Sequence, residues 1–216
     1  MKRFIRNFRI SVACLFVLNF LGCGTSQPSH FYLLRAVSPA SVSGLSDTKL
    51  SSLSFGLGPV TLPKYLDRPQ IVTKTSAHEV ELAEFHKWAE PLSENVSHVL
   101  AENLSALLST DRLLQYPWKS STPVDCQIAV DVLQFDGTMG GEAGLVARWS
   151  LLGGDEQTVL TTKRTHVTHY PTSQNYEALV EAMSQNLEDL SREIAEAIRA
   201  LPSRIQPGSS LSSSVQ

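Results

Sequence analysis

Apolar residues recur at every third and fourth position in two long stretches of the chain, which is the spacing of one face of an α-helix. The first stretch begins at Pro91, a residue that suits the first position of a helix, and its apolar face includes Asn103 and ends at Leu108. The second runs over residues 174–200, and Pro202 stops it. The spacing therefore predicts two amphipathic helices, each with one face that packs against other elements.

Apolar and polar residues alternate in shorter segments, as they do in half-buried β-strands. The clearest segment covers residues 124–132, with Cys126 at an apolar position, and a change of phase at Leu133 and Phe135 indicates a bulge or a strong twist. The other predicted strands lie at residues 30–34, 53–62, 70–75, 79–83, 145–152 and 159–170. Glycine-bearing connections make the last three strands of the chain an antiparallel meander. The pattern predicts an α+β domain, an antiparallel or mixed β-sheet with both helices on one face.

The N-terminal residues follow a different pattern. Four basic residues, Lys2, Arg3, Arg6 and Arg9, precede an uncharged apolar run over residues 10–21. As a helix, these 12 residues would span about 18 Å at ~1.5 Å per residue, which is shorter than the ~30 Å hydrocarbon core of a bilayer. The segment is therefore interpreted as an export signal and not as a membrane span.

The export signal ends in Phe20, Leu21, Gly22 and Cys23, which resembles the bacterial lipobox except that Phe20 stands where leucine is typical. The resemblance implies that Cys23 carries a thioether-linked diacylglycerol and an N-acyl chain and becomes the first mature residue; no other cofactor is expected. An ordinary cleaved signal, with Cys23 near the cut, is the alternative. The expected parts are a lipoprotein signal at 1–22, a lipidated tether at 23–29, a folded domain at 30–201 and a disordered Ser-rich tail at 202–216.

Charge and cysteine content limit the function of the exported part. The whole chain has 18 Lys and Arg against 21 Asp and Glu, a formal net charge of −3, and loss of the four N-terminal cations lowers this to −7. An acidic domain is not expected to bind nucleic acid, because that requires basic residues to neutralise phosphates. With Cys14 in the signal and Cys23 acylated, Cys126 has no disulfide partner, so the hydrophobic core alone must hold the domain.

Candidate catalytic and metal sites are few. The sequence contains no GxSxG, HExxH, CxxC or GxxxxGK[ST] motif. His166 and His169 are three residues apart in a predicted strand, which places them on opposite faces, where they cannot share a metal ion. Glu84 and His86 fall on one strand face and form a candidate cation pair, although ordinary surface residues are the more frequent outcome of such a pattern.

Two carboxylates, Asp136 and Glu142, are spaced like a catalytic pair but lie in a Gly-rich connection. They are interpreted as turn residues, a common role of aspartate beside glycine. With no nucleophile, base or metal cluster in view, we expect a protein that is not an enzyme.

Aromatic and arginine side chains in loops are candidate contacts for a partner. The segment between Pro63 and Pro69 is expected to be an ordered loop that carries Tyr65 and Arg68, and such a stiff loop loses little entropy when it binds. Trp118 lies in another loop, and Trp88 immediately precedes the first helix. Partner binding and ordinary surface packing are both open for Tyr65, Arg68 and Trp118. For Trp88, burial as a hydrophobic staple is favoured over a place in a partner surface.

Several segments resemble the ABC-type transport auxiliary lipoprotein family. The most specific are LPKYLDRPQIV at residues 62–72 and WAEPL at residues 88–92, directly before the amphipathic helix. Further matches are FYLL (31–34), VDVLQFDG (130–137), ARWSLL (147–152) and LSREIAEAI (190–198). The resemblance covers the whole mature domain and leaves the tail after Pro202 without an assigned role.

The resemblance implies a non-catalytic part of a lipid transport system in the Gram-negative envelope. Its expected partners are an MCE-domain protein and the associated ABC transporter components, with a ring-like homo-oligomer as a further expectation. Gly24, after the lipidated cysteine, fits sorting to the periplasmic face of the outer membrane. The competing hypothesis is a stand-alone envelope lipoprotein that binds peptidoglycan or another protein without moving lipid.

Overall fold

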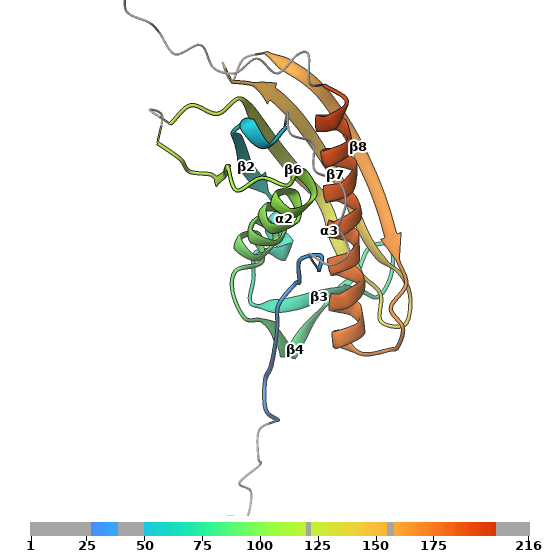
Figure 1. Ribbon diagram of the computed structural model, residues 1–216. Coiled ribbons are helices and arrows are strands. Elements are labelled where there is room, and N and C mark those ends of the chain that lie inside the picture. Colours follow the sequence, from blue (N-terminus) through green and yellow to red (C-terminus); the bar gives the residue numbers. More distant parts are fainter. Residues whose placement is uncertain (1–26, 39–49, 120–121, 155–157, 202–216) are drawn as a thin grey trace, which may run out of the picture.

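The computed structural model of the protein describes residues 27–38, 50–119, 122–154 and 158–201. The predicted export signal, Cys23 and the Ser-rich tail lie outside these residues. In chain order the elements are β1 (His30–Tyr32), η3 (Leu50–Ser52), β2 (Phe55–Thr61), η4 (Lys64–Leu66), β3 (Gln70–Lys74), β4 (Val80–Trp88), α2 (Leu92–Leu108), β5 (Leu113–Gln115), β6 (Cys126–Gly137), β7 (Ala143–Gly153), β8 (Val159–His169) and α3 (Tyr176–Arg199). The strands form one curved sheet, and both long helices cover the same face of it, as predicted (Figure 1).

β6 is the central strand of the sheet. β7 pairs antiparallel with it along its whole length, and β8 pairs antiparallel with β7, which confirms the predicted meander. Two strands pair with the other edge of β6. β2 runs parallel to the first half of β6, and β3 pairs with the last residue of β6 through Thr73 and Gly137.

The strands beyond β6 make the sheet mixed. β3 and β4 form an antiparallel hairpin, β1 lies parallel to the end of β4, and β5 lies parallel to the start of β2. The strand order is therefore β1-β4-β3-β6-β2-β5, with β7 and β8 continuing from β6. The three-residue strand β5 is absent from the prediction, and β1 ends at Tyr32, two residues earlier than predicted.

A bulge in β6 explains the change of phase at Leu133. The pairing with β7 shifts between Val132 and Gln134, so one extra residue is accommodated in β6. After the shift, Phe135 returns to the buried positions with no exposed surface, while Gln134 and Asp136 point to the opposite side of the sheet.

The core lies between the sheet and the two helices. Its largest fully buried side chains are Trp149, Phe55, Phe135, Leu50, Leu57, Ile71, Leu100, Leu104, Leu107, Leu108, Ile128 and Leu145. Cys126 is a core residue as predicted, with no exposed surface, and its burial together with the charge of Asp125 raises the pKa of its thiol to about 12. The α3 helix begins at an Asn175 cap whose side chain accepts a hydrogen bond from the N–H of Ala178 at 2.8 Å.

The segment after β1 lies over the two helices and is held by their side chains. The N–H groups of Leu34 and Val37 donate to the Oδ1 atoms of Asn95 and Asn103 of α2, each at 2.7 Å. The N–H of Arg35 donates to Oγ of Ser184 of α3 at 3.1 Å. Residues 33–38, which we call the strap, therefore connect β1 to both helices.

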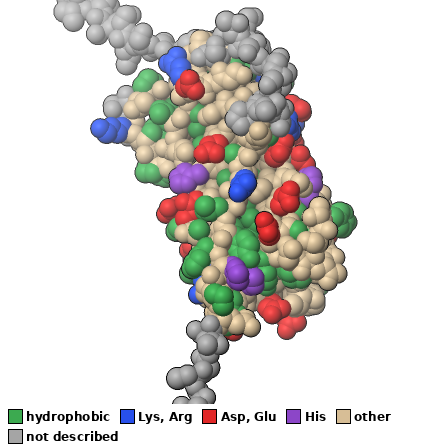
Figure 2. Space-filling view, turned by 60° about the horizontal axis from the view of Figure 1, so that its bottom comes forward, with side chains coloured by type: hydrophobic (Ala, Val, Ile, Leu, Met, Phe, Trp, Pro, Cys, Tyr) green, Lys and Arg blue, Asp and Glu red, His purple; other side chains and the backbone are tan. Residues whose placement is uncertain are grey.

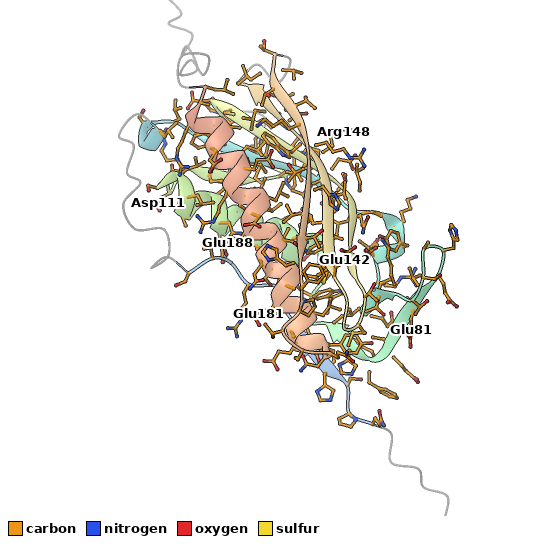
Figure 3. The ribbon with its side chains drawn as sticks, turned by 90° about the vertical axis from the view of Figure 1, so that its right-hand side faces the viewer. Glu81, Asp111, Glu142, Arg148, Glu181 and Glu188 are labelled. Carbon is orange, nitrogen blue, oxygen red and sulfur yellow. The ribbon has the colours of Figure 1, made fainter. Side chains whose placement is uncertain are left out.

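The sheet face opposite the helices is covered only in part. In Figure 3, α3 lies on one side of the strands while Arg148 of β7 points away from it, toward the open face. The segment with η4 lies on this open side, at the end of β6 that carries Asp136. The Pro-bracketed loop is thus fixed to the sheet and not free in solvent.

Candidate docking site

The loop between Pro63 and Pro69 is ordered, as its two prolines predict. It makes one turn of 3₁₀-helix, in which the N–H of Leu66 donates to the carbonyl of Pro63 at 3.0 Å. Leu66 is 2% exposed and anchors the loop in the core, whereas Tyr65 is half-buried. The hydroxyl of Tyr65 donates to Oδ2 of Asp136 at 2.6 Å, so this ring supports the loop from beneath instead of standing free at its tip.

Asp136 is the buried centre of that support. It is 1% exposed, and besides Tyr65 it accepts from Nε2 of Gln134 at 3.0 Å and pairs with Nζ of Lys74 at 3.0 Å. A buried carboxylate is tolerated only when such partners replace its water. The pKa of Tyr65 is raised well above its ordinary value, chiefly because the phenol is buried and further because of its hydrogen bond to Asp136 and the charge of that carboxylate. The phenol therefore remains a hydrogen-bond donor.

The interpretation of Asp136 as a turn residue is therefore wrong. Asp136 belongs to β6, which continues to Gly137, and only Glu142 lies in the turn, where it is exposed. The sequence predicts an earlier end of this strand, because an aspartate before glycine is typical of turns. The bulge at Leu133 is the signal that could have placed Asp136, because it resets which residues of β6 point to the open face.

One hydrogen bond made by Arg68 lies within the loop, and one accepted by Pro69 joins the loop to β4. Nε of Arg68 donates to the carbonyl of Tyr65 at 2.7 Å, and the N–H of Trp88 donates to the carbonyl of Pro69 at 2.7 Å. The loop and the end of β4 then enclose a groove of about 330 Å³, which we call the Arg68 groove, lined by Asp67, Arg68, Pro69, Trp88, Ala89, Glu90 and Pro91. Two of the predicted partner-binding residues, Arg68 and Trp88, meet in this groove.

The charged groups of the Arg68 groove are held in place to different degrees. Oε1 of Glu90 accepts from Nδ2 of Asn95 at 2.7 Å and lies 3.7 Å from Nδ1 of His98. Arg68 is half-buried, and within the described part of the chain its guanidinium makes no ion pair. Trp88 is 5% exposed, which confirms the favoured core position, so it contributes only a small part of its surface to the groove. The groove therefore combines proline rings with an arginine whose charge is available to a ligand.

Trp118 lies apart from the Arg68 groove. Its ring packs over Gly56 of β2, where an added Cβ would come within 2.8 Å of it, and it meets the ring of Tyr116 edge-on at 5.7 Å. It is half-buried. Of the four predicted contact residues, the structure brings Arg68 and Trp88 together, places Tyr65 under the same loop and assigns Trp118 to the packing on β2.

The histidine candidates have other partners. His86 does not form a pair with Glu84, because its Nδ1 is hydrogen-bonded to the hydroxyl of Tyr32 at 2.7 Å and its ring stacks on Tyr176 at 4.0 Å. His169 is hydrogen-bonded to Asp189 of α3 at 2.8 Å, while His166 is exposed. Within the described ranges, no group of three or more His, Cys, Asp or Glu side chains is placed to hold a metal ion, and no helix there is long and apolar enough to cross a membrane.

Comparison with known proteins gives relatives over nearly the whole chain. The sequence model of a family described as ABC-type transport auxiliary lipoprotein component matches residues 32–195. The intermembrane transport lipoprotein PqiC of Escherichia coli (strain K12) is 23% identical over 199 residues, which cover 92% of this chain and all of the relative. PqiC of Shigella flexneri matches equally.

Solved structures with the same fold are also known. The crystal structure of an uncharacterized protein has a TM-score of 0.65 at 22% identity and covers 80% of this chain and 99% of its own. Protein XCC0632 from Xanthomonas campestris has a TM-score of 0.62 at 15% identity, with 78% of this chain and 94% of its own covered. At these identities the likeness shows the fold alone.

Proposed function

Because the chain belongs to the ABC-type transport auxiliary lipoprotein component family, we propose that it is a non-catalytic, lipid-anchored adaptor of an intermembrane lipid transport system. In this proposal Cys23 carries the acyl chains, and they hold the folded domain at the periplasmic face of the outer membrane. The Arg68 groove then docks the domain on an MCE-domain partner, which the associated ABC transporter energises. Lipid passes through or beside that junction.

The anchor is supported by sequence and by family. Residues 20–23 resemble a lipobox after an export signal, and the family is one of lipoproteins. The relative PqiC is named as an intermembrane transport lipoprotein. Each buried CH₂ contributes ~0.8 kcal/mol to membrane binding, so two or three acyl chains would make the attachment effectively permanent.

The Arg68 groove is the observation that carries the docking role. Its loop is fixed at three points: Leu66 in the core, the Tyr65 hydroxyl on Asp136, and the carbonyl of Pro69 on the N–H of Trp88. A surface that is already ordered loses little conformational entropy when a partner binds, which leaves more of the contact energy for affinity. Arginine is also one of the residue types enriched among strong interface contacts.

The groove also indicates the chemistry of the partner segment. Pro69, Pro91 and Trp88 offer apolar walls, and the guanidinium of Arg68 offers donors in a planar arrangement that fits a carboxylate. We therefore expect an apolar side chain next to an acidic one in the partner segment. Asp67 and Glu90, at the sides of the groove, would disfavour a segment with acidic groups on both flanks.

Substitution of Arg68 tests the docking role. Arg68→Ala should weaken binding of a purified MCE-domain partner by about tenfold or more, and Arg68→Glu should weaken it further, because a strong interface arginine is lost or reversed in charge. Affinity is measured with the acylated protein in detergent or in vesicles. The matched controls are Arg148→Ala and Arg148→Glu on the open sheet face, which should bind as the unmodified protein does.

Two outcomes would count against this assignment. Equal affinity of the Arg68 and Arg148 variants would remove the groove from the interface. Binding of peptidoglycan or another lipoprotein, with none of the MCE-domain protein, would instead favour the stand-alone envelope lipoprotein.

A further inference from the structure

Strand β1 presents its side chains to two different environments. His30 and Tyr32 point toward α3, whereas Phe31 is 65% exposed and Leu33, the next residue after the strand, is 50% exposed. Large apolar side chains left in water on an edge strand and directly after it favour aggregation unless a membrane or another protein covers them.

β1 is held firmly, so the exposure of Phe31 is not the result of a loose terminus. The ring of His30 stacks on His86 at 5.2 Å, and His86 stacks on Tyr176, the first residue of α3, at 4.0 Å. The hydroxyl of Tyr32 is hydrogen-bonded to His86, and the main chain of β1 pairs with the end of β4. This aromatic cluster fixes the side chains that alternate with Phe31 and Leu33.

Phe31 and Leu33 lie apart from the exposed hydrophobic side chains at the start of β4. The strand registers join Val80 to Lys74, Thr73 to Gly137 and Ala143 to His169, so the start of β4 and the end of β8 meet at one end of the sheet. Val80, Leu82 and Tyr170 are exposed hydrophobic residues of this end, whereas Phe31 and Leu33 lie with the other end of β4, with which β1 pairs. Figure 2 shows hydrophobic side chains gathered beside a histidine close to where the described chain begins. We call Phe31 and Leu33 the apolar end.

The length of the tether places the apolar end near the bilayer. Cys23 precedes His30 by seven residues, and seven residues reach about 25 Å at most when fully extended. If Cys23 is acylated, which this inference takes from the proposed function, β1 must lie within that distance of the lipid. No other strand of the sheet is so closely limited by the chain itself.

We propose that the apolar end rests on the phospholipid surface, with Phe31 and Leu33 inserted among the headgroups. Aromatic and apolar side chains on a polar surface favour that interfacial zone. Lys87 pairs in register with Phe31 and is placed to meet lipid phosphates. Exposed Glu81 and Glu84 of β4 oppose a purely electrostatic attraction, so contact depends on apolar insertion and does not require anionic lipid.

This orientation has a consequence for the Arg68 groove. The N–H of Ala89, which lines the groove, donates to the carbonyl of Tyr32 in β1 at 2.9 Å. The groove therefore adjoins the apolar end, and a partner seated in it would be brought close to the bilayer surface. The last residues of β7 and the first residues of β8 lie at the opposite end of the sheet and, in this orientation, away from the membrane.

Spin labels on the acylated full-length protein test the membrane contact. Phe31→Cys and Leu33→Cys each provide one labelling site, because the thiol of Cys126 is buried and its pKa is raised. Val159→Cys is the matched control, since Val159 is a 59% exposed hydrophobic residue at the start of β8. The labelled proteins are reconstituted in vesicles of phosphatidylethanolamine and phosphatidylglycerol. The collision rates of each spin label with lipid-soluble oxygen and with a water-soluble nickel chelate are then compared.

The expected result is a several-fold higher ratio of oxygen to nickel collisions at positions 31 and 33 than at position 159, in vesicles with and without phosphatidylglycerol. Mass spectrometry and flotation of the same samples report the anchor separately. Acylated, floating protein with all three labels in water would overturn the membrane contact and leave the anchor intact. Labels at 31 and 33 shielded from both reagents would also overturn it, because protein, such as a second copy, would then cover the apolar end. Absence of fatty acid would overturn the anchor, and the tether argument with it.

Discussion

Asp136 connects three elements through one buried carboxylate. Its partners are Tyr65 from the Pro-bracketed loop, Lys74 from β3 and Gln134 from β6 itself. At 1% exposure the carboxylate has exchanged its water for these groups, so each of them matters more than it would on the surface. The position of the loop, and with it the shape of the Arg68 groove, thus depends on single polar atoms.

Tyr65→Phe tests this dependence by removing one oxygen. The ring can still pack, but Asp136 loses its closest donor, and we expect the free energy of unfolding to fall by about 1–3 kcal/mol. Chemical denaturation measures the change. Tyr170→Phe is the control, because Tyr170 is 72% exposed and loss of its hydroxyl should change stability by less than about 0.5 kcal/mol. Equal stability of the two variants would mean that Asp136 does not need Tyr65.

At the scale of elements, two buried asparagines of α2 organise the strap. Asn95 and Asn103 accept the N–H groups of Leu34 and Val37, and Nδ2 of Asn103 donates to Oγ of Ser191 in α3 at 3.2 Å. Asn103 thereby connects the strap to both helices. The helical spacing places Asn103 on the buried face of its helix, and the structure supplies the reason for an amide there: it satisfies a backbone N–H that would otherwise be buried without a partner.

Asn103→Ala should therefore loosen the strap. The N–H of Val37 would lose its acceptor, with an expected cost of about 1–3 kcal/mol, and the amide hydrogen of Val37 should exchange with solvent much faster. Hydrogen exchange read by NMR or mass spectrometry measures this. Glu102→Ala, at the exposed neighbouring position, should leave exchange unchanged. Unaltered protection of Val37 in Asn103→Ala would show that other contacts hold the strap.

The elements that sequence could predict are those with local periodicity. Both helices, the β6-β7-β8 meander and the bulge at Leu133 follow from spacing within single segments. The parallel pairs β2–β6 and β1–β4 join segments far apart in the chain, and nothing in either segment specifies such a partner. β5 has only three residues, too few for alternation to be visible.

The candidate site was predictable to the same extent. The prolines at 63 and 69 indicate an ordered loop, and the preference for a buried Trp88 is confirmed. That Arg68 and Trp88 line one groove depends on how the β3–β4 hairpin folds back, which the residues alone do not specify. The role of Tyr65 under the loop is not visible in the sequence, because its acceptor, Asp136, lies 71 residues further along the chain.

At the scale of the whole molecule, the proposed functions share one end. The predicted lipid attachment precedes β1 by a few residues, the apolar end consists of Phe31 in β1 and Leu33 just after it, and the Arg68 groove is hydrogen-bonded to β1 through Ala89. The family match over residues 32–195 covers the Arg68 groove and Leu33, and it begins one residue after Phe31. The arrangement suits the proposed non-catalytic adaptor, which would hold a transport partner close to the membrane.

The central claim is that the native protein is an acylated adaptor bound to a lipid transport partner. Affinity purification of the full-length protein from cell membranes, followed by mass spectrometry of its N-terminus, its bound proteins and its bound lipids, tests this most directly. The account predicts a mature chain that starts at Cys23 with fatty acyl groups, recovered together with an MCE-domain protein and phospholipid. A chain without fatty acid on Cys23, or one recovered from membranes without an MCE-domain protein, would contradict it.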